Sequence, residues 1–343
     1  MSLSALDSID DALQATKGLL LPFDRAIWLR LAVVMFFVGG GGGFSFPNTS
    51  NFGGSDFGNG GGVGGTPSGQ VQPPEFTPEL MGLIAGFALV VLLIVLVLAV
   101  LGGIMEFVFV ESLGTEEVRL KQYVSENWGR GLRLFGFRIG FGLLNLLVVV
   151  AVLAAIAAAT VGFSPEQWTP GGLIGVVLLA IPFLILDALV AGTITGFTTM
   201  FVVPIMLLEE RGVLSAWRRF WPTLKTEWKE YVSYGIMAFI LNIVTAIAQG
   251  IIGFVLVLVV TIPFAVVGFG LYFALGGANG VGVIVGSVIL VLAVLFVLVV
   301  IVLSLLVKVP FQSFLRYYAL FVLGDTNDSF DAVAEVRASV RAD

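Results

Sequence analysis

Six long apolar runs constrain what this chain can fold into. In hydrocarbon a backbone must satisfy its own hydrogen bonds, so a run of about 20 apolar residues crosses a bilayer as an α-helix. The runs lie at about 26–44, 80–110, 134–163, 172–208, 231–275 and 281–307. We therefore expect an all-α, polytopic membrane helical bundle, a single membrane domain over 1–343 with six spans arranged as three hairpins.

The composition agrees with a membrane protein and narrows the chemistry. Hydrophobic residues make up 58% of the 343 residues and charged residues 12%, whereas a soluble domain carries about 25% charged residues. The chain has no histidine and no cysteine, which excludes disulfides, thiol nucleophiles, imidazole or thiolate metal sites and histidine-based acid–base catalysis. We expect no enzymatic activity, no catalytic residue, no metal site and no cofactor.

The positive charges indicate how the chain is oriented. All 17 Lys and Arg residues fall in the segments 1–30, 111–138, 209–230 and 308–343. The alternate loops, at 45–79, 164–171 and 276–280, contain none. By the positive-inside rule, both termini of this multi-pass protein of the cell membrane are expected in the cytoplasm. Cytoplasmic segments are predicted at 1–25, 111–133, 209–230 and 308–343.

The run at 231–275 is too long for one simple span. As a continuous helix it would reach about 67 Å, against about 30 Å of hydrocarbon. It therefore contains two crossings, or part of it is kinked, re-entrant or outside the membrane, and Pro263 is a natural break point. One crossing is favoured because two would place Lys308 and Arg316 outside, but the path of 259–280 stays open.

A faint internal repeat supports the hairpin arrangement. The stretch 144–147 (Leu-Asn-Leu-Leu) resembles 241–244 (Leu-Asn-Ile-Val), and 181–183 recurs as 262–264, both reading Ile-Pro-Phe. The implied unit is a helical hairpin followed by a cytoplasmic surface helix, about 100 residues long and present three times. The alternative is that low-complexity apolar sequence aligns with itself by chance.

Polar residues inside the spans form a candidate intramembrane site. Asp187 is the acidic residue predicted deepest in a span, and Asn145 and Asn242 belong to the polar residues expected around it. Because such groups are costly in hydrocarbon, they should face the bundle or a cavity. One hypothesis makes Asp187 an ion or proton site. The other makes it structural, either protonated or paired with Arg138.

The segment 209–230 is rich in tryptophan and basic residues. Residues that suit the lipid headgroup layer recur there at helical spacing: Trp217, Arg218, Arg219, Trp221 and Trp228. The alternative is that the tryptophans pack on the protein's own spans. Pro222 predicts a break into two short helices. Four glutamates offset the basic charge, so we expect no nucleic-acid binding.

The predicted outer loop, 45–79, is rich in glycine and should be flexible. It contains the sequon Asn48-Thr49-Ser50, so Asn48 is a candidate glycosylation site on the outer face.

Two stretches carry a resemblance to known proteins. They are 203–222, which reads Val-Pro-Ile-Met-Leu-Leu-Glu-Glu-Arg-Gly-Val-Leu-Ser-Ala-Trp-Arg-Arg-Phe-Trp-Pro, and 227–231, which reads Glu-Trp-Lys-Glu-Tyr. Here the chain resembles an uncharacterised family of haloarchaeal six-span integral membrane proteins, which implies an archaeal, halophilic source. Its layout is also loosely similar to the membrane domain of glycerophosphodiester phosphodiesterases, although their soluble catalytic domain is absent, so that activity does not carry over.

Two functional classes remain for such a chain. The first is a non-enzymatic membrane scaffold or complex subunit that acts through its cytoplasmic interfacial helices. The second is a transporter or channel whose pathway includes Asp187. The lipid bilayer is the expected partner in both cases, other membrane proteins are candidate partners, and the oligomeric state stays open.

Overall fold

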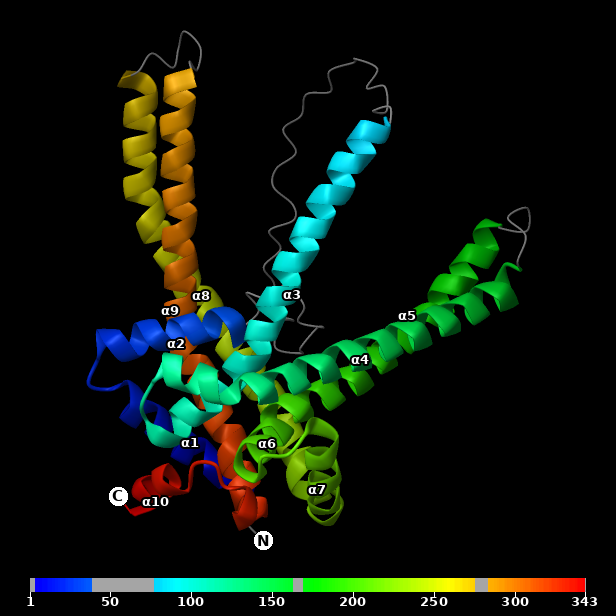
Figure 1. The fold of residues 1–343 in the computed structure, drawn as a ribbon, viewed down its shortest axis with the longest axis vertical. Coiled ribbons are helices and arrows are strands. Elements are labelled where there is room, and N and C mark those ends of the chain that lie inside the picture. The colour runs from blue at the N-terminus through cyan, green and yellow to red at the C-terminus, as the bar shows by residue number, and fades with distance from the viewer. Residues whose placement is uncertain (1–3, 39–76, 163–168, 275–282, 343) are drawn as a thin grey trace.

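The computed structural model describes residues 4–38, 77–162, 169–274 and 283–342, and in these ranges the chain is helical without strands (Figure 1). Its α-helices are α1 Ser4–Leu20, α2 Arg25–Val38, α3 Pro78–Thr115, α4 Leu120–Thr160, α5 Pro170–Phe197, α6 Val203–Glu209, α7 Val213–Thr226, α8 Trp228–Ala274, α9 Val283–Thr326 and α10 Ala334–Ala342. A π-helix, η3 Thr198–Val202, joins α5 to α6, and a 3₁₀-helix, η5 Asp328–Phe330, precedes α10.

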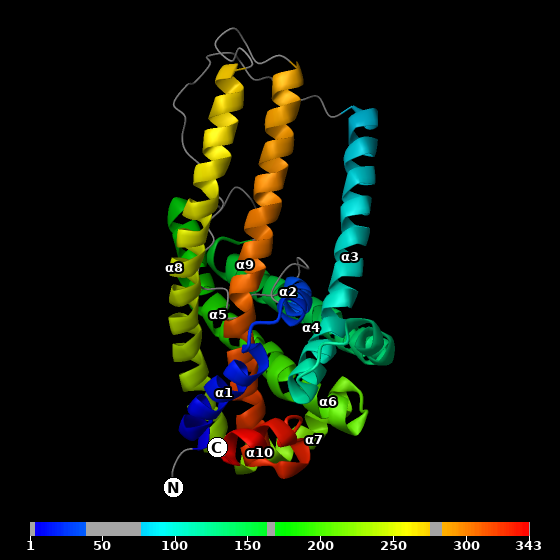
Figure 2. The ribbon, with the colours of Figure 1, turned by 90° about the vertical axis from the view of Figure 1, so that its left-hand side faces the viewer.

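Three arms rise from a common base (Figures 1 and 2). One arm is α3 alone, the second is α4 side by side with α5, and the third is α8 side by side with α9. The base contains α1, α2, α6, α7 and α10, together with the inner ends of the long helices, and both chain termini lie there. Within the described ranges, five helical stretches are long and apolar enough to cross a membrane.

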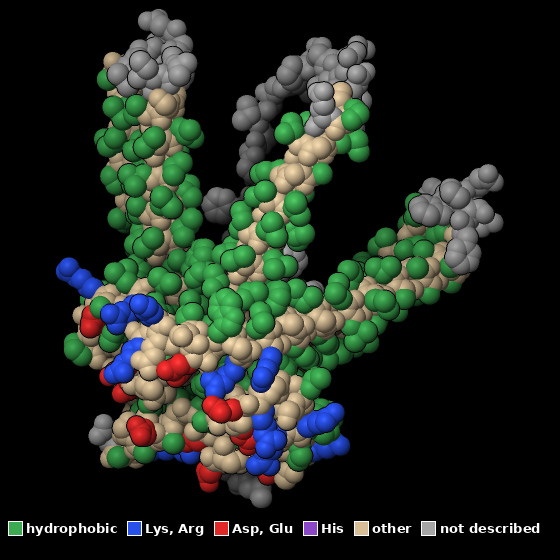
Figure 3. All heavy atoms as spheres, viewed as in Figure 1, with side chains coloured by type: hydrophobic (Ala, Val, Ile, Leu, Met, Phe, Trp, Pro, Cys, Tyr) green, Lys and Arg blue, Asp and Glu red, His purple; other side chains and the backbone are tan. Residues whose placement is uncertain are grey.

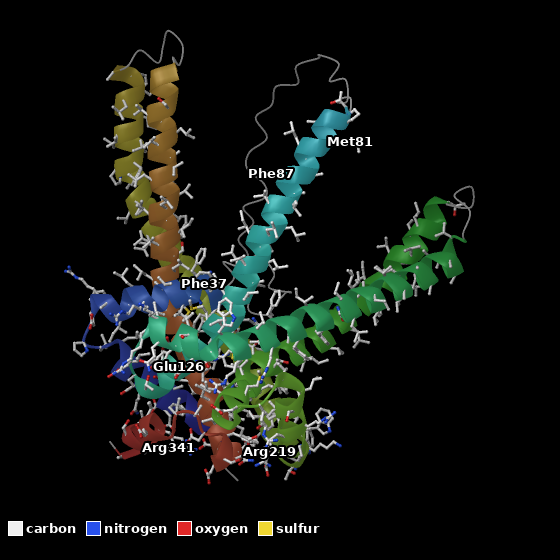
Figure 4. The ribbon with its side chains drawn as sticks, in the orientation of Figure 1. Phe37, Met81, Phe87, Glu126, Arg219 and Arg341 are labelled. Atoms are coloured by element: carbon white, nitrogen blue, oxygen red, sulfur yellow. The ribbon has the colours of Figure 1, made fainter. Side chains whose placement is uncertain are left out.

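The base and the arms differ in what their apolar side chains contact. In the base, Phe201 stacks on Phe220 with ring centroids 5.6 Å apart, and Tyr234 meets Phe201 edge-on at 4.9 Å. In the arms, side chains such as Met81 and Phe87 of α3 project outward without cover (Figure 4). Figure 3 shows charged side chains gathered over the base and hydrophobic ones along the arms. The arms therefore match a hydrocarbon environment.

α2 differs from the first predicted span, 26–44. It has 14 residues, which extend about 21 Å, less than the roughly 30 Å of hydrocarbon. It lies across α3 and α9 and buries Leu31, Val34 and Met35 against them (Figure 1). Residues 39–44 of the predicted span lie outside the described residues, and the arrangement of six spans in three hairpins stays a prediction.

Prolines end fewer helices than the sequence predicts. α8 is a single helix through Pro263, so the break predicted at this proline in 231–275 is absent. α7 likewise contains Pro222, and the chain breaks instead at Glu227, before α8. Proline removes one backbone donor. α7 nonetheless continues through Pro222, so the prediction of two short helices in 209–230 was wrong.

Several helices also run past the predicted ends of their spans. α4 begins at Leu120 and continues through the predicted cytoplasmic segment 111–133 into the span. α9 continues from the predicted span 281–307 to Thr326. The surface segments expected there are thus the inner ends of long helices, which continue past Gly131 in α4 and through Pro310 in α9.

Two glycines let α3 and α4 cross closely. A Cβ on Gly131 would lie 2.7 Å from the Cα of Ile104, and one on Gly103 would lie 2.8 Å from the carbonyl oxygen of Gly131. Real side chains do not approach this closely. The crossing brings the inner part of α4 against the inner part of α3, where the polar residues of both helices meet.

Candidate functional site: an arginine–glutamate–arginine cluster beside a π-helix

A carboxylate held between two guanidinium groups lies at the centre of the base. Glu106 comes from α3, Arg138 from α4 and Arg316 from α9. Nη2 of Arg138 lies 3.1 Å from one Glu106 oxygen, and Nη2 of Arg316 lies 3.1 Å from the other. The side chains of Glu106 and Arg316 are 5% and 2% exposed, and that of Arg138 is 32% exposed. The cluster thus ties three long helices together.

The rest of the Arg316 side chain is enclosed by apolar groups. Its Nη1 donates to the sulfur of Met200 at 3.2 Å, and its guanidinium carbon lies 5.9 Å from the ring centre of Phe109. Its Nε has no hydrogen-bond partner among the described residues. Burying a charge is favourable only when it is well paired. Arg316 therefore depends on Glu106.

A π-helix supplies one wall of the cluster. Arg138 donates to the Thr199 hydroxyl at 3.1 Å, and Trp217 of α7 donates to the Thr198 hydroxyl at 3.0 Å. Both threonines belong to η3, between α5 and α6. Single π-turns in α-helices are rare and occur frequently at functional sites. The cluster therefore connects the joint at the foot of α5 to α4 and to α7.

A second polar chain continues along the inner part of α4. Asn127, which is fully buried, donates to the Glu111 carboxylate at 2.7 Å. Arg130 donates to Asn127 at 2.7 Å and, from its other terminal nitrogen, to Glu210 at 2.7 Å. Asn127, Arg130 and Arg138 recur at three- and eight-residue steps, which places them on one face of the helix. This face binds α4 to α3 and to the end of α6.

The two ends of the described chain are joined by ion pairs. Arg341 of α10 lies 2.7 Å from Asp11 of α1 and 2.8 Å from Asp325 of α9. Arg337 lies 2.8 Å from Asp325 and 2.6 Å from Asp331. Hydrogen bonding to Asp325 raises the pKa of the Arg341 guanidinium, so this group stays charged. Figure 4 shows Arg341 at the foot of the molecule, on the short terminal helix.

The structure brings together only part of the predicted intramembrane site. Asn145 donates to Asp187 at 3.2 Å, which links α4 to α5 within their arm. Asn242 instead donates to the carbonyl of Ala238 in its own helix. Arg138 does not pair with Asp187 as one hypothesis expected, because Glu106 and Thr199 take its hydrogen bonds. Whether Asp187 and its polar neighbours serve transport or structure stays a prediction.

The predicted lipid-interface residues fall on two sides of α7 and its junction with α8. Trp217 is half-buried against η3, as the alternative of packing on the protein expected. Arg219 faces Glu209 at 3.1 Å and lies over the Phe330 ring at 5.4 Å. Arg218, Trp221 and Trp228 are exposed. The remaining predicted position, Asn48, lies outside the described residues.

Sequence reasoning missed Glu106 and Arg316 as site residues. Glu106 stands inside the run 80–110, where it is the acidic residue between Gly103 and Val110. Arg316 follows Pro310 in a segment that was predicted to be a cytoplasmic tail. A charged residue flanked by large apolar side chains was the available signal, but the sequence does not say that the two residues, 210 positions apart, are partners.

Comparison with known proteins gives one match. No curated protein and no solved structure matches the chain. A family model described as a family of unknown function, DUF7544, matches residues 3–333. This agrees with the expected resemblance to an uncharacterised family, whereas the haloarchaeal source and the similarity to the phosphodiesterase membrane domain stay predictions. With the match covering nearly all of its length, the chain belongs to the DUF7544 family.

Proposed function

We propose that this protein is a non-enzymatic membrane scaffold or complex subunit, with its arms in the bilayer and its base on the cytoplasmic side. The observation that carries the proposal is the separation of the three arms. Among the described residues the arms meet only at the base (Figure 1), and their side chains are apolar and exposed along most of their length. Such arms offer lipids and partner helices a large surface, whereas the charged base holds the arms in place.

Chain connectivity supports six crossings. α1 packs against α10, so both ends of the described chain belong to the base, whereas α3 begins at the far tip of its arm (Figure 1). Five crossings by α3, α4, α5, α8 and α9 then require a sixth between Leu21 and Pro78. If the apolar run 26–44 makes this crossing, as its composition favours, α2 must turn away from its place across α3 and α9 when the protein enters the bilayer. Both termini would then lie in the cytoplasm of the cell.

The exposed side of α7 is the proposed interfacial contact. Leu214, Arg218, Trp221 and Lys225 recur at three- and four-residue steps and are all exposed. Lys225 lies 5.4 Å over the ring of Trp221, with Trp228 a short distance along the chain. We call Leu214, Arg218, Trp221, Lys225 and Trp228 the α7 stripe. Arg218 and Lys225 pair with no carboxylate among the described residues, and tryptophan beside such basic residues suits the headgroup layer or a membrane-bound partner.

A transporter or channel is the second candidate. The supporting observation is that Asp187, inside the α4–α5 arm, bonds to Asn145 but to no cation among the described residues. An ionised carboxylate at such depth costs about 2.5–3.5 kcal/mol, so a bound cation would stabilise it there. The scaffold is favoured because the arm places Asp187 between only two helices, with its apolar neighbours exposed.

Site-specific photo-crosslinking in cells tests the scaffold. A photoreactive amino acid at Leu214 or Trp221 should form crosslinks to lipid or to another membrane protein. The matched control is Ala216, which is buried on the opposite side of α7 and should crosslink only within the chain. Absence of intermolecular crosslinks from the α7 stripe, together with solute flux by the purified protein in vesicles, would favour the transporter.

A further inference from the structure

The arginine–glutamate–arginine cluster has more positive than negative charge. Two guanidinium groups share one carboxylate, and the charged groups that face Arg316 are Glu106 and Arg138. An excess buried charge is costly unless a further counter-ion balances it. Since no second carboxylate joins the cluster within the described residues, its charge favours an additional anion.

The cluster also has unused donors. Both hydrogen bonds of Arg138 start from Nη2, so its Nε and Nη1 have no partner among the described residues. Its side chain is 32% exposed, whereas its two partners in the cluster are enclosed. Nε of Arg316 is buried without a partner. Arg138 is therefore the one member of the cluster through which an outside anion can be bound.

The position of Arg138 along α4 identifies the kind of anion. From Arg138 to the end of α4 at Thr160 the helix extends about 33 Å, close to the roughly 30 Å thickness of hydrocarbon. If α4 crosses the bilayer, as the proposed function assumes, Arg138 lies at the headgroups of the inner leaflet. The half-buried side chain of Phe141 continues from it on the same face of α4, and the exposed Ile139 lies beside it, where an acyl chain would lie.

We infer that Arg138 binds the phosphate of an anionic phospholipid of the inner leaflet and thereby balances the charge of the buried cluster. A guanidinium donates strong, charge-assisted hydrogen bonds to phosphate oxygens. With Nη2 on Glu106 and Thr199, the N–H groups of Nη1 and the separate N–H of Nε are the donors available to the lipid. The lipid would then stabilise the junction of α3, α4, α9 and η3.

Lipid-dependent thermal stability tests this site on the purified full chain in a neutral detergent. Adding phosphatidylglycerol should raise the Tm by about 2–4 °C relative to the same amount of phosphatidylcholine. Arg138→Gln should abolish this difference. Arg133→Gln is the matched control because Arg133 is exposed on the same helix and pairs with no described carboxylate. This variant should keep the difference in Tm between the two lipids. Equal shifts in Arg138→Gln and the native protein would overturn the inference.

Two further measurements complete the test. Inorganic phosphate should give no shift, and a shift as large as that of the lipid would assign the site to a free anion instead. Because Arg138→Gln can also weaken folding, photoactivatable phosphatidylglycerol should be crosslinked to the native protein and the products mapped. Labelling concentrated on 134–143 supports the site. Labelling of the arms only at other positions would overturn the lipid site but not the proposed scaffold function. No labelling of any arm would contradict membrane embedding itself.

Discussion

At the scale of single residues, the base depends on a few charged side chains that are buried away from solvent. Glu106 serves two guanidinium groups at 3.1 Å each, and it comes from a helix that is otherwise apolar nearby. Removing one partner of a buried pair leaves the other uncompensated, which costs far more than losing an exposed pair. The effect of a charge substitution in this protein should therefore depend on where the charge lies.

Glu106→Gln should lower the free energy of unfolding by about 3–5 kcal/mol, because Arg316 then has no carboxylate in its enclosed site. The measurement is thermal or denaturant unfolding in one detergent. The control is Glu117→Gln, which removes an exposed pair with Arg119 and should change stability by about 0.5 kcal/mol or less. Similar losses in the two variants would contradict the assigned role of Glu106.

Asp187→Asn should leave both stability and vesicle flux close to those of the native protein, since an amide can keep the hydrogen bond to Asn145. Ion-coupled flux that is present in the native protein and lost in this variant would support transport instead. Because Arg138 bonds to Glu106 and not to Asp187, the effects of Asp187→Asn and Arg138→Gln on stability should add. Strong coupling in the double variant would indicate a direct pair.

Asp187 and Asn145 show what a sequence can and cannot give at this scale. Their contact was expected because a polar group in an apolar run is costly and seeks a polar neighbour on an adjacent helix. The contact between Arg138 and Glu106 was not expected. Whether Arg138 meets Asp187 or Glu106 depends on how far α4 extends below its span and on where it crosses α3. Both are set by tertiary packing.

At the scale of helices, hydrophobicity located the long elements but not their ends. The apolar runs become α3, α4, α5, α8 and α9, yet α4 and α9 extend well past their runs, and α7 passes through Pro222. Helical propensity and apolar composition are different properties, and only composition changes where a helix leaves the hydrocarbon. The orientation of α2 across α3 and α9 depends on packing between distant segments, which a run of 14 residues does not encode.

Gly131→Ala tests the close crossing of α3 and α4. The added methyl group would lie 2.7 Å from the Cα of Ile104, so backbone must move, and we expect a loss of about 1–3 kcal/mol in unfolding free energy. Gly129→Ala is a control two residues away, where nothing lies within 4 Å. It should stabilise α4 by about 0.5–1 kcal/mol. Thermal unfolding of the two variants should thus shift in opposite directions, and equal shifts would rule out the crossing.

Arg341→Gln should release α10 from α1 and α9, because it removes the pairs with Asp11 and Asp325. Hydrogen–deuterium exchange over 334–342 should increase several-fold, and high salt should partly reproduce the change in the native protein. The raised pKa of Arg341 gives stability that is fully present below the pKa of an arginine in the unfolded chain and is lost only as the pH rises through the still higher folded-state pKa, so exchange corrected for its intrinsic rate should not change between pH 6 and about 10. Unchanged exchange in the variant would show that apolar contacts alone hold α10.

At the scale of the whole molecule, the base and the arms are suited to different solvents. Charged side chains gather on the base in Figure 3, and the arms carry almost none. The positive-inside rule, applied to the 17 Lys and Arg residues, then predicts the base in the cytoplasm. This orientation is open to direct measurement, because the chain has no cysteine of its own.

Single-cysteine labelling tests the orientation. A cysteine in place of Ser215, on α7, should react with an impermeant maleimide only after cells are permeabilised. A cysteine in place of Gly61, in the predicted outer loop 45–79, should react in intact cells. The reverse pattern would invert the orientation and with it the leaflet proposed to contact Arg138.

The separation of arms from base also has an evolutionary consequence. A side chain that contacts only lipid can be exchanged for another apolar one at little cost, since a fluid solvent adapts to its shape. Glu106, Arg316 and Gly131 each face fixed neighbours and have no such freedom. Among members of the family, residues at the tips of α3, α5 and α8 should therefore often be replaced by other apolar residues. Residues at the inner ends should change slowly, so sequence conservation should concentrate in the base.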